Sequence, residues 1–390
     1  MTFLLTGGTA VNPQTAFRAN IRISGTRIVE VAEGLRPRTN ELVLDCTDQY
    51  LFPGLINAHD HLSFNLFPRL GDPPYPNSYE WGNQIRSKYK STIDPIVRIP
   101  LRHRLYWGAW KNLFSGVTTV VHHDPYFLDF RLGYPVNVFP RYTFAHSLGF
   151  ERDMGAVLQK RRESTPFIIH LAEGTDQRAA GEVESLYELG GLDSRTVAVH
   201  AVGIQQTDVE TLQKAQTSVV WCPASNYFLF NTTAPVDNLR GKVGIAIGTD
   251  STITGSSSLF DELRVAQRGR SLTPQELFGM VTDSPRRIFG LQHDAGAIVK
   301  EGRADLFVLS ASDVTPYSAL LHAKPGDITL LFRRGKVLFH DACFDKCFRH
   351  DRTSEPRVTL NGKVKWIASR RFSKRFQTYR AFLHQYSYLN

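Results

Sequence analysis

The residues with the clearest chemical potential are His59 and His61, which follow the apolar segment 54–58 (GLINA). In a strand, side chains two residues apart point to the same side, so these two imidazoles would face one point. Imidazole is a good ligand for Zn²⁺, Fe²⁺ and similar metals. A His-x-His pair also occurs by chance and on surfaces, so the pair alone does not establish a metal site.

Further His, Glu and Asp residues stand at the ends of later apolar segments. They are His170 and Glu173 in PFIIHLAE, His200 in TVAVHA and Asp250 at the end of VGIAIGTD. In a barrel of parallel strands, the carboxyl ends share one rim, where active sites are built. Each residue taken singly has a structural explanation, such as a helix cap for the Asp. Together, four strand ends with such groups favour one metal-containing active site.

The elements that must position these residues follow from the apolar pattern. Between about residues 51 and 291, short Val- and Ile-rich segments alternate with longer helical patterns, which indicates βα units and a parallel sheet. Residues 1–50 and 304–340 instead contain strands separated by turn residues. The sequence therefore predicts an α/β fold with a TIM-like (β/α) barrel and a small β-sandwich domain built from both chain ends.

We expect the chain to divide into the first part of the sandwich (1–52), the metal-dependent barrel (53–292), the second part of the sandwich (293–342), and a linker with a C-terminal helix (343–390). The barrel has one weak point. Between segments 116–121 and 166–171 only one clear strand is visible, at 138–145, and two βα units would need more chain. Either a short strand is hidden near 126–132, or the barrel is distorted and one unit short.

In order along the chain, the motifs resemble those of the amidohydrolase superfamily. They are PGLINAHDHL, GVTTVVHHD, IIHLAEGT, VAVHAVGI, VVWCPASNYFL, GIAIGTDS and GRADLFVL, and the resemblance runs over about residues 1–340. Within the superfamily, the chain is most similar to the branch of cytosine and guanine deaminases and triazine (chloro)hydrolases. The motifs are specific for the superfamily and much less so for the substrate.

The resemblance implies a role for each residue. The metal ligands would be His59, His61, His170 and Asp250, and the catalytic residues Glu173, His200 and Asp250. The ligands would hold one divalent ion, Zn²⁺ first and Fe²⁺ as the alternative, which lowers the pKa of its water toward ~7. Glu173 would carry protons to the leaving group, while Asp250 and His200 orient and deprotonate the water. A bridged two-metal variant needs a lysine at a strand end, whereas Lys160 lies in a helical pattern.

Four residues are predicted to contact the substrate: Trp81, His123, His146 and Asn226. Trp81 belongs to the long segment 63–90, which is expected to cap the pocket and stack on a planar ring. A surface insertion with its own small apolar core is an equal alternative for this segment. His123 and His146 follow strands whose ends face the same rim, and ordinary packing is the alternative for both.

These observations predict a metal-dependent hydrolase of C–N bonds other than peptide bonds. The favoured reaction is deamination of a small heterocyclic or amidine-like molecule by a metal-bound hydroxide. Glu173 favours deamination, because a ring nitrogen must be protonated when an exocyclic amine leaves. Two alternatives stay open: ring opening of an imidazolone- or lactam-type cyclic amide at the same site, and a catalytically idle barrel that binds partners through its basic tail.

The net charge of +9 has an identifiable source. Residues 363–390 contain seven Lys and Arg residues and no acidic ones, so +9 minus +7 leaves about +2 for residues 1–362. Apolar residues recur there at helical spacing, at Phe372, Phe376, Tyr379, Leu383 and Tyr386, which predicts a basic amphipathic helix. Packing of its stripe on the protein itself, or on a second subunit of a homo-oligomer, is favoured over binding to nucleic acid or a membrane.

The remaining features concern the compartment. The four cysteines are dispersed and do not suggest a disulfide framework. The amino-terminal apolar run is too short for a signal peptide, and no apolar stretch approaches the ~18 residues that span a bilayer. These features predict a cytoplasmic protein.

Overall fold

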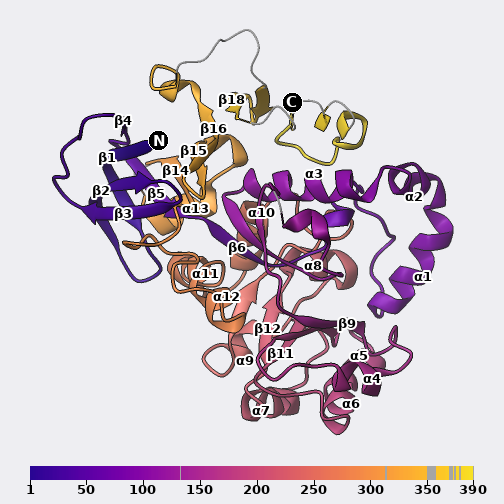
Figure 1. Ribbon diagram of the computed structural model, residues 1–390. Coiled ribbons are helices and arrows are strands. Elements are labelled where there is room, and N and C mark those ends of the chain that lie inside the picture. The colour runs from indigo at the N-terminus through magenta and orange to yellow at the C-terminus, as the bar shows by residue number, and fades with distance from the viewer. Residues whose placement is uncertain are drawn as a thin grey trace.

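The computed structural model describes residues 1–131, 133–311, 314–348, 357–368, 372, 375–376 and 379–389 (Figure 1). Both ends of the chain build one β-sheet. Its strands are β1 (Thr2–Val11), β2 (Ala16–Ser24), β3 (Arg27–Ala32), β4 (Glu41–Asp45), β5 (Gln49–Pro53), β14 (Leu306–Ser310), β15 (Ile328–Arg333), β16 (Lys336–Asp341), β17 (Arg357–Leu360) and β18 (Lys363–Ile367). They lie in the order β17-β18-β16-β15-β14-β5-β1-β2-β3, with β4 beside β1.

The two halves of this sheet meet where β5 runs antiparallel to β14, with Phe52 opposite Phe307. Their rings stack with centroids 5.3 Å apart. In Figure 1 the indigo amino-terminal strands and the orange β14–β16 lie side by side at one end of the molecule. A β-domain built from both chain ends is therefore present, but its described strands form one continuous sheet and not the two separate sheets of the predicted sandwich.

The carboxy-terminal segment differs from the predicted linker and helix. Residues 357–360 and 363–367 are the strands β17 and β18, which extend the sheet beyond β16. Buried Lys365 donates to Asp341 at 2.9 Å and to two backbone carbonyls, so pairing with β16 outweighs any helical preference of KVKWI. A helix beginning at residue 363 is therefore wrong. Arg370, Arg371 and Lys374, part of the predicted basic face, lie outside the described residues.

The apolar stripe predicted for the tail packs on helix α3 (Leu101–Leu113). The ring of Phe372 lies 4.4 Å from that of Trp110, and the ring of Tyr386 lies 5.2 Å from that of Trp107. The Tyr386 hydroxyl accepts a hydrogen bond from Trp107 Nε1 at 3.0 Å and donates to the Asn65 carbonyl. The expectation that this stripe packs on the protein itself is thus confirmed for these residues.

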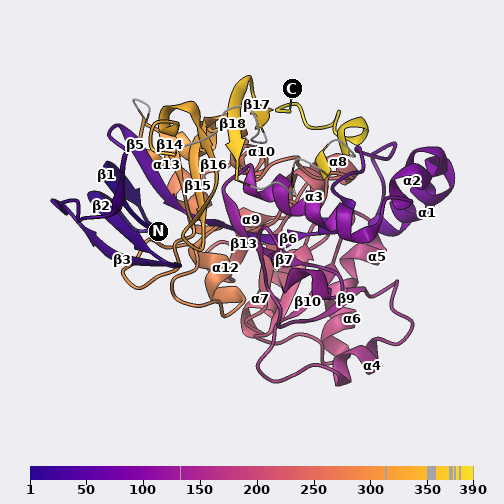
Figure 2. The same ribbon diagram turned by 45° about the horizontal axis from the view of Figure 1, so that its top comes forward.

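The barrel region contains eight strands among the described residues: β6 (Leu55–Asp60), β7 (Val117–His122), β8 (Asn137–Val138), β9 (Thr143–Ser147), β10 (Phe167–Leu171), β11 (Thr196–His200), β12 (Ser218–Trp221) and β13 (Ile245–Ile247). They form two parallel sheets, β6-β7-β8 and β9-β10-β11-β12-β13 (Figure 2). The last strand returns to the first, because the Asp250 amide donates to the His59 carbonyl at 3.1 Å.

The predicted single strand at 138–145 is wrong, because the segment breaks into β8 and β9 around Pro140. Proline has no N–H to donate to a strand ladder. The hidden short strand is β8, with two residues. The described part of 126–132 instead contains a 3-10 turn, Leu128–Phe130 (η2). Eight strands are therefore present among the described residues, but no described α-helix separates β7 from β8 or β8 from β9, so the barrel is distorted there.

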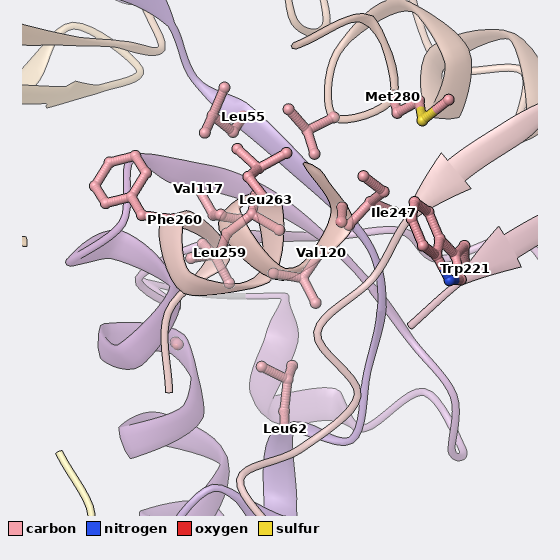
Figure 3. Close-up of a cluster of buried hydrophobic side chains, with 14 of the residues drawn as sticks. Leu55, Leu62, Val117, Val120, Trp221, Ile247, Leu259, Phe260, Leu263 and Met280 are labelled. Carbon is pink, nitrogen blue, oxygen red and sulfur yellow. The ribbon is translucent and has the colours of Figure 1, made fainter. Parts of the chain in front are cut away.

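Helices cover the outside of the barrel. They are α4 (Met154–Gln159), α5 (Gln177–Ala180), α6 (Glu182–Glu188), α7 (Gln206–Lys214), α8 (Pro223–Phe230), α9 (Val236–Leu239), α10 (Leu259–Gln267), α11 (Pro274–Gly279), α12 (Asp283–Ile288) and α13 (Pro316–His322). Buried side chains of β6, β7, β13 and α10 form the core in Figure 3. Ser258 caps α10 by accepting from the Asp261 amide at 3.1 Å. Among the described residues, no helix has both the length and the apolar character required to cross a membrane.

The long segment after β6 folds over the carboxyl ends of the strands. It contains the 3-10 turn Leu62–Phe64 (η1) and the helices α1 (Ser78–Lys88) and α2 (Lys90–Val97). The Asn77 side chain caps α1 by accepting from the Glu80 amide at 3.0 Å. The Ser78 amide donates to the Glu173 carbonyl at 3.0 Å, which joins the start of α1 to the end of β10.

Candidate active site

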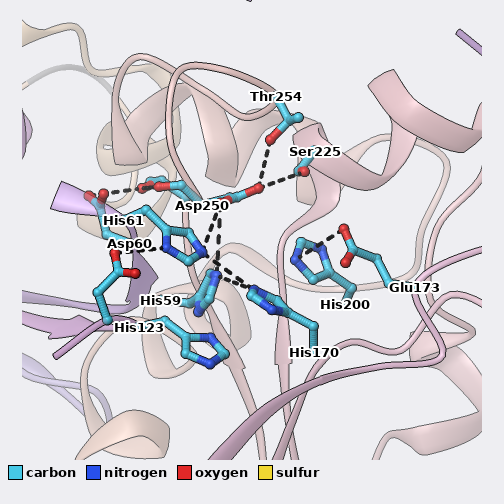
Figure 4. Close-up of polar contacts among 12 residues, drawn as sticks. His59, Asp60, His61, His123, His170, Glu173, His200, Ser225, Asp250 and Thr254 are labelled. Carbon is cyan, nitrogen blue, oxygen red and sulfur yellow. Dashed lines mark hydrogen bonds and ion pairs between the residues drawn. The ribbon is translucent and has the colours of Figure 1, made fainter. Parts of the chain in front are cut away.

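Three imidazoles and one carboxylate converge at the carboxyl ends of the barrel strands (Figure 4). Nε2 of His170 lies 3.4 Å from Nε2 of His59 and 3.4 Å from Nε2 of His61. Oδ1 of Asp250 lies 3.9 Å from Nε2 of His59 and 3.8 Å from Nε2 of His61. All four residues are buried. Donor atoms about 2.0–2.1 Å from one tetrahedral ion are about 3.3–3.4 Å apart. The donor set and its spacing therefore fit a single divalent cation.

The second ring nitrogen orients two of these imidazoles. His170 Nδ1 donates to the His146 carbonyl at 2.6 Å, which leaves Nε2 with a free lone pair. His61 Nδ1 lies 3.2 Å from Oδ2 of Asp124. Hydrogen bonds of this kind fix the tautomer and ring orientation of metal-ligating histidines. His59 is held by its strand, and its buried Nδ1 has no partner among the described residues.

Burial controls the protonation of the ligands. Burial, reinforced by the nearby His123, lowers the pKa of His59 and of His170 well below the ordinary value. Burial also lowers the pKa of His61, but the nearby Asp124 carboxylate has the larger opposite effect and raises this pKa to about 9. A cation close to His61 Nε2 opposes its protonation. The neutral imidazoles that metal binding requires are therefore favoured at His59 and His170 even without the ion.

Asp250 presents only one oxygen to the imidazoles. Its Oδ2 accepts hydrogen bonds from Ser225 at 2.9 Å and from Thr254 at 2.6 Å. Its backbone is left-handed, with φ of 52°, which is a strained conformation for a residue other than glycine. This combination points Oδ1 toward the Nε2 atoms of His59 and His61, and the strain is typical of functional sites.

His200 and Glu173 face each other beside the ligands. Nε2 of His200 lies 3.5 Å from Oε1 of Glu173. His200 Nδ1 donates to Oδ1 of Asn226 at 2.8 Å, so the neutral ring has a free lone pair on Nε2. Burial raises the pKa of the Glu173 carboxyl, and the nearby His200 partly opposes this. A carboxyl group with a raised pKa suits proton transfer near neutral pH.

A cavity of about 370 Å³ opens onto these groups, and two of the four predicted substrate contacts, Trp81 and His146, line it. His123 does not line this cavity. Its ring stacks on that of His170 at 4.2 Å, and its Nε2 lies 2.9 Å from the Ala145 carbonyl. Its other nitrogen falls in the same buried cluster as the three imidazole ligands.

Asn226 also lies away from the cavity lining, which corrects its prediction as a substrate contact. It is fully buried, and its Nδ2 donates to the His200 carbonyl at 3.1 Å while its Oδ1 accepts from the His200 ring. Asn226 therefore positions His200. The sequence prediction erred because a residue of helix α8 can point either to the rim or behind it, and no local signal separates the two.

The sequence prediction missed a buried charge network behind the ligands. The Asp60 carboxylate accepts hydrogen bonds from Asn57 at 3.1 Å, Asn65 at 2.8 Å, Asn112 at 2.7 Å and Lys111 at 3.2 Å. Lys111, on α3, also donates to Thr249 at 2.8 Å. The network ties β6, α3 and the end of β13 together directly under His59, His61 and Asp250. Its only sequence signal was an Asp between two histidines, which gives no indication of a distant lysine partner.

Replacing Lys111 by Met should lower the free energy of unfolding by about 3–5 kcal/mol, because Asp60 would remain buried without a countercharge. Denaturant unfolding of the two proteins measures the difference. Lys214, an exposed helical lysine, provides the control, and Lys214→Met should change stability by less than about 0.5 kcal/mol. A loss below about 1 kcal/mol for Lys111→Met would contradict the proposed importance of the pair.

The burial of the Glu262 carboxyl group leads us to expect that the stability of the protein depends on pH. It lies fully buried on α10 and accepts from the Ala224 amide at 2.8 Å, and burial raises its pKa to about 7. The folded state thus binds more protons than the unfolded state between pH ~4.5 and ~7, so stability falls as pH rises through this window. Glu262→Gln should be more stable than wild type at pH 8, on the order of 3 kcal/mol, and nearly equal at pH 4.5. Urea unfolding at both pH values tests this, with exposed Glu184→Gln as control; a stability difference that does not depend on pH would contradict it.

A parallel-stranded barrel with a β-domain and a buried His and Asp cluster at the strand ends defines the class of metal-dependent barrel hydrolases. Residues 145–338 match the amidohydrolase family. The chain is 27% identical to 5-methylthioadenosine/S-adenosylhomocysteine deaminase of Pyrococcus horikoshii, over 87% of this chain and 95% of the relative. It is 25% identical to 5'-deoxyadenosine deaminase of Methanothrix thermoacetophila, over 84% of this chain and 91% of the relative.

Solved structures share the fold. An adenosine deaminase from Xanthomonas campestris with bound zinc superimposes with a TM-score of 0.74 at 19% identity, covering 97% of each chain. An atrazine chlorohydrolase from Arthrobacter aurescens complexed with zinc superimposes with a TM-score of 0.73 at 16% identity, covering 98% of this chain and 100% of the other. The family match over residues 145–338 confirms the resemblance seen in the motifs and, with the deaminase relatives, supports a hydrolase that acts on carbon–nitrogen bonds. The histidine cluster and the zinc in these neighbours support a divalent metal in the site.

Proposed function

We propose that this protein is a zinc-dependent aminohydrolase that removes an exocyclic amino group, as ammonia, from a small heterocyclic amidine. The observation that carries the proposal is the convergence of His59, His61, His170 and Asp250 beside the facing pair Glu173 and His200. The names of the curated relatives, which are deaminases of adenosine-type compounds, support the same reaction.

The ligand set is three imidazole nitrogens and one carboxylate oxygen, which suits Zn²⁺ and admits Fe²⁺ as the alternative. When bound, the ion supplies a Lewis acid and an activated water. His59, His61 and His170 hold it as neutral imidazoles. Asp250 adds the negative charge and, through Oδ1, accepts a proton from the attacking water.

Glu173 and His200 carry out the proton transfers. Glu173 takes one proton of the water and delivers it to the ring nitrogen beside the attacked carbon. His200, fixed by Asn226, orients the water by accepting a hydrogen bond from it through the Nε2 lone pair. The proton held by Asp250 then reaches the exocyclic nitrogen, the C–N bond breaks, and ammonia leaves. One water and one amidine thus give one carbonyl compound and one ammonia.

An ammonia-release screen tests the proposal. The zinc-loaded protein is incubated with amino-substituted purines, pyrimidines, triazines and open-chain amidines, and with imidazolones and lactams. Ammonia formed in equal amount to a carbonyl product supports deamination. Consumption of an imidazolone or lactam without ammonia would overturn it in favour of ring opening. Absence of bound metal, with binding activity confined to the basic tail, would overturn it in favour of a scaffold protein.

A further inference from the structure

The catalytic cavity is polar at its inner end, and its outer end carries one charged side chain among the described residues, that of Arg86. The carboxylates in its lining belong to Asp124, Glu173 and Asp250, and each faces a histidine of the catalytic cluster. The outer wall is formed by apolar side chains from the segment after β6, from α1 and α2, and from the loop after β9. They are Phe64, Phe67, Trp81, Ile85, Val97 and Phe150.

Contacts outside the cavity hold this apolar wall in place. Trp81 Nε1 donates to the Leu70 carbonyl at 2.9 Å, so the face of its indole is left for a ligand. The Phe67 carbonyl accepts from Thr252 at 2.8 Å, and the Phe67 ring packs edge-on against Phe64 at 5.8 Å. Phe150 packs against Tyr79 at 5.1 Å. Because these side chains are already held in place, they lose little conformational entropy when a ligand binds.

Apolar side chains also remain exposed at the mouth of the cavity. Phe64 is 37% exposed and Val97 is 53% exposed. Exposed apolar surface that continues into a cavity is typical of a binding groove. The polar group at this end is exposed Arg86, whose guanidinium lies 5.7 Å from the centre of the Phe150 ring.

The described residues of this outer wall include no carboxylate or amide side chain. A sugar has adjacent hydroxyls that both donate and accept hydrogen bonds, and each hydroxyl buried without a partner is unfavourable. An alkyl or aryl group, by contrast, gains from each methylene that it removes from water. Arg86, the hydrogen-bonding side chain described at this end, can only donate, so a hydroxyl proton finds no side-chain acceptor there and the outer wall discriminates against hydroxylated substituents.

We propose that the substrate is an amino-heterocycle whose ring carries an alkyl or aryl substituent, and that a ribosyl substituent at the same place is disfavoured. This inference rests on the proposed deamination for its reaction, and on the outer wall for its specificity. The amidine end of the ring lies at Glu173 and His200, and the substituent extends between Trp81, Phe64 and Val97 toward the mouth.

Two matched compound series test the proposal. One consists of 9-methyl-, 9-ethyl-, 9-propyl- and 9-butyladenine with 9-(2-hydroxyethyl)adenine and adenosine, and the other of aminotriazines with the same alkyl and hydroxyalkyl groups. Ammonia release by the zinc-loaded enzyme gives kcat/KM, and calorimetry with zinc-loaded Glu173→Gln gives binding. We expect about a fourfold increase per methylene in at least one series, and at least tenfold weaker use of hydroxylated members.

Two variants locate the effect. Phe64→Ser and Val97→Ser change exposed residues of the mouth and should remove most of the preference for the longer alkyl groups, measured within each variant as the ratio of kcat/KM for the butyl and methyl compounds. Leu128→Ser, at an exposed apolar residue outside the cavity lining, should leave the preference unchanged.

The outcomes separate the two proposals. Alkyl-dependent binding without ammonia from any compound would overturn deamination and support the apolar wall. Ammonia release that is equal or faster with adenosine or hydroxyalkyl members would overturn the specificity and leave deamination standing. Equal binding of all members of both series would also overturn the specificity.

Discussion

We expect Glu173→Gln protein to retain one equivalent of metal and to lose about 10³-fold in kcat, because the amide can neither accept nor deliver the proton. The side chain keeps its size, and its backbone carbonyl still holds the start of α1 through the Ser78 amide. Its effect should therefore fall on kcat, with substrate affinity changed little. Steady-state ammonia release and metal analysis by mass spectrometry on the same preparation measure both quantities.

Glu184→Gln is the matched control, because Glu184 is an exposed glutamate of helix α6. It should retain full activity. If Glu173→Gln kept more than about a tenth of the wild-type kcat, another group would have to transfer the proton. Loss of metal from Glu173→Gln would show instead that this carboxylate supports the ligands.

We expect His170→Ala protein to lose the metal, and with it all measurable turnover. Two of the close donor contacts, each 3.4 Å, include Nε2 of His170. Its removal leaves two imidazoles and one carboxylate, and even changes outside the ligand set typically cost 10–100-fold in metal affinity. We expect the zinc dissociation constant to rise by more than about 10²-fold, so that dialysis against a moderate chelator empties the variant and not the wild type.

Exposed His293→Ala provides the control and should keep one equivalent of zinc. Thermal unfolding supplies a readout that does not depend on turnover, because an ion that binds only the folded state stabilises it. Zinc should raise the melting temperature of wild type and of His293→Ala, and should leave that of His170→Ala unchanged. Retention of stoichiometric zinc by His170→Ala after dialysis would contradict the proposed ligand set.

The sequence placed most of the catalytic cluster because two rules apply to it directly. Alternation along a strand put His59 and His61 on one side, and the common rim of parallel strands brought His170, His200 and Asp250 to them. The structure brings these residues together as expected. Their assigned roles stay predictions, as do the domain boundaries, the homo-oligomer and the cytoplasmic location.

The features that the sequence did not reveal depend on distant parts of the chain. Strand β8 has two residues, too few for any periodic signal, and it exists because β7 lies beside it. Strand β18 forms through pairing with β16, whereas the helical apolar spacing on which the predicted helix rested begins only at Phe372. Lys111 looks like an ordinary helical lysine until Asp60 is folded against it. In each case the structure depends on contacts between residues far apart in the sequence, and local residue spacing does not reveal such contacts.

The junction between β5 and β14 also limits when the β-sheet can form during synthesis on the ribosome. Phe52 of β5 can pair with Phe307 of β14 only after Phe307 has been synthesised. In the same way, Trp107 can bond to Tyr386 only after a further 279 residues have been added. Synthesis proceeds at about 5–20 residues per second, so the edge of β5 stays unpaired for roughly 13–50 s. The nascent chain therefore carries an open strand edge until β14 has been synthesised, and an open edge can pair with other chains. The Phe67 carbonyl in the cavity wall gains its hydrogen bond from Gln385 only after a further stretch of synthesis.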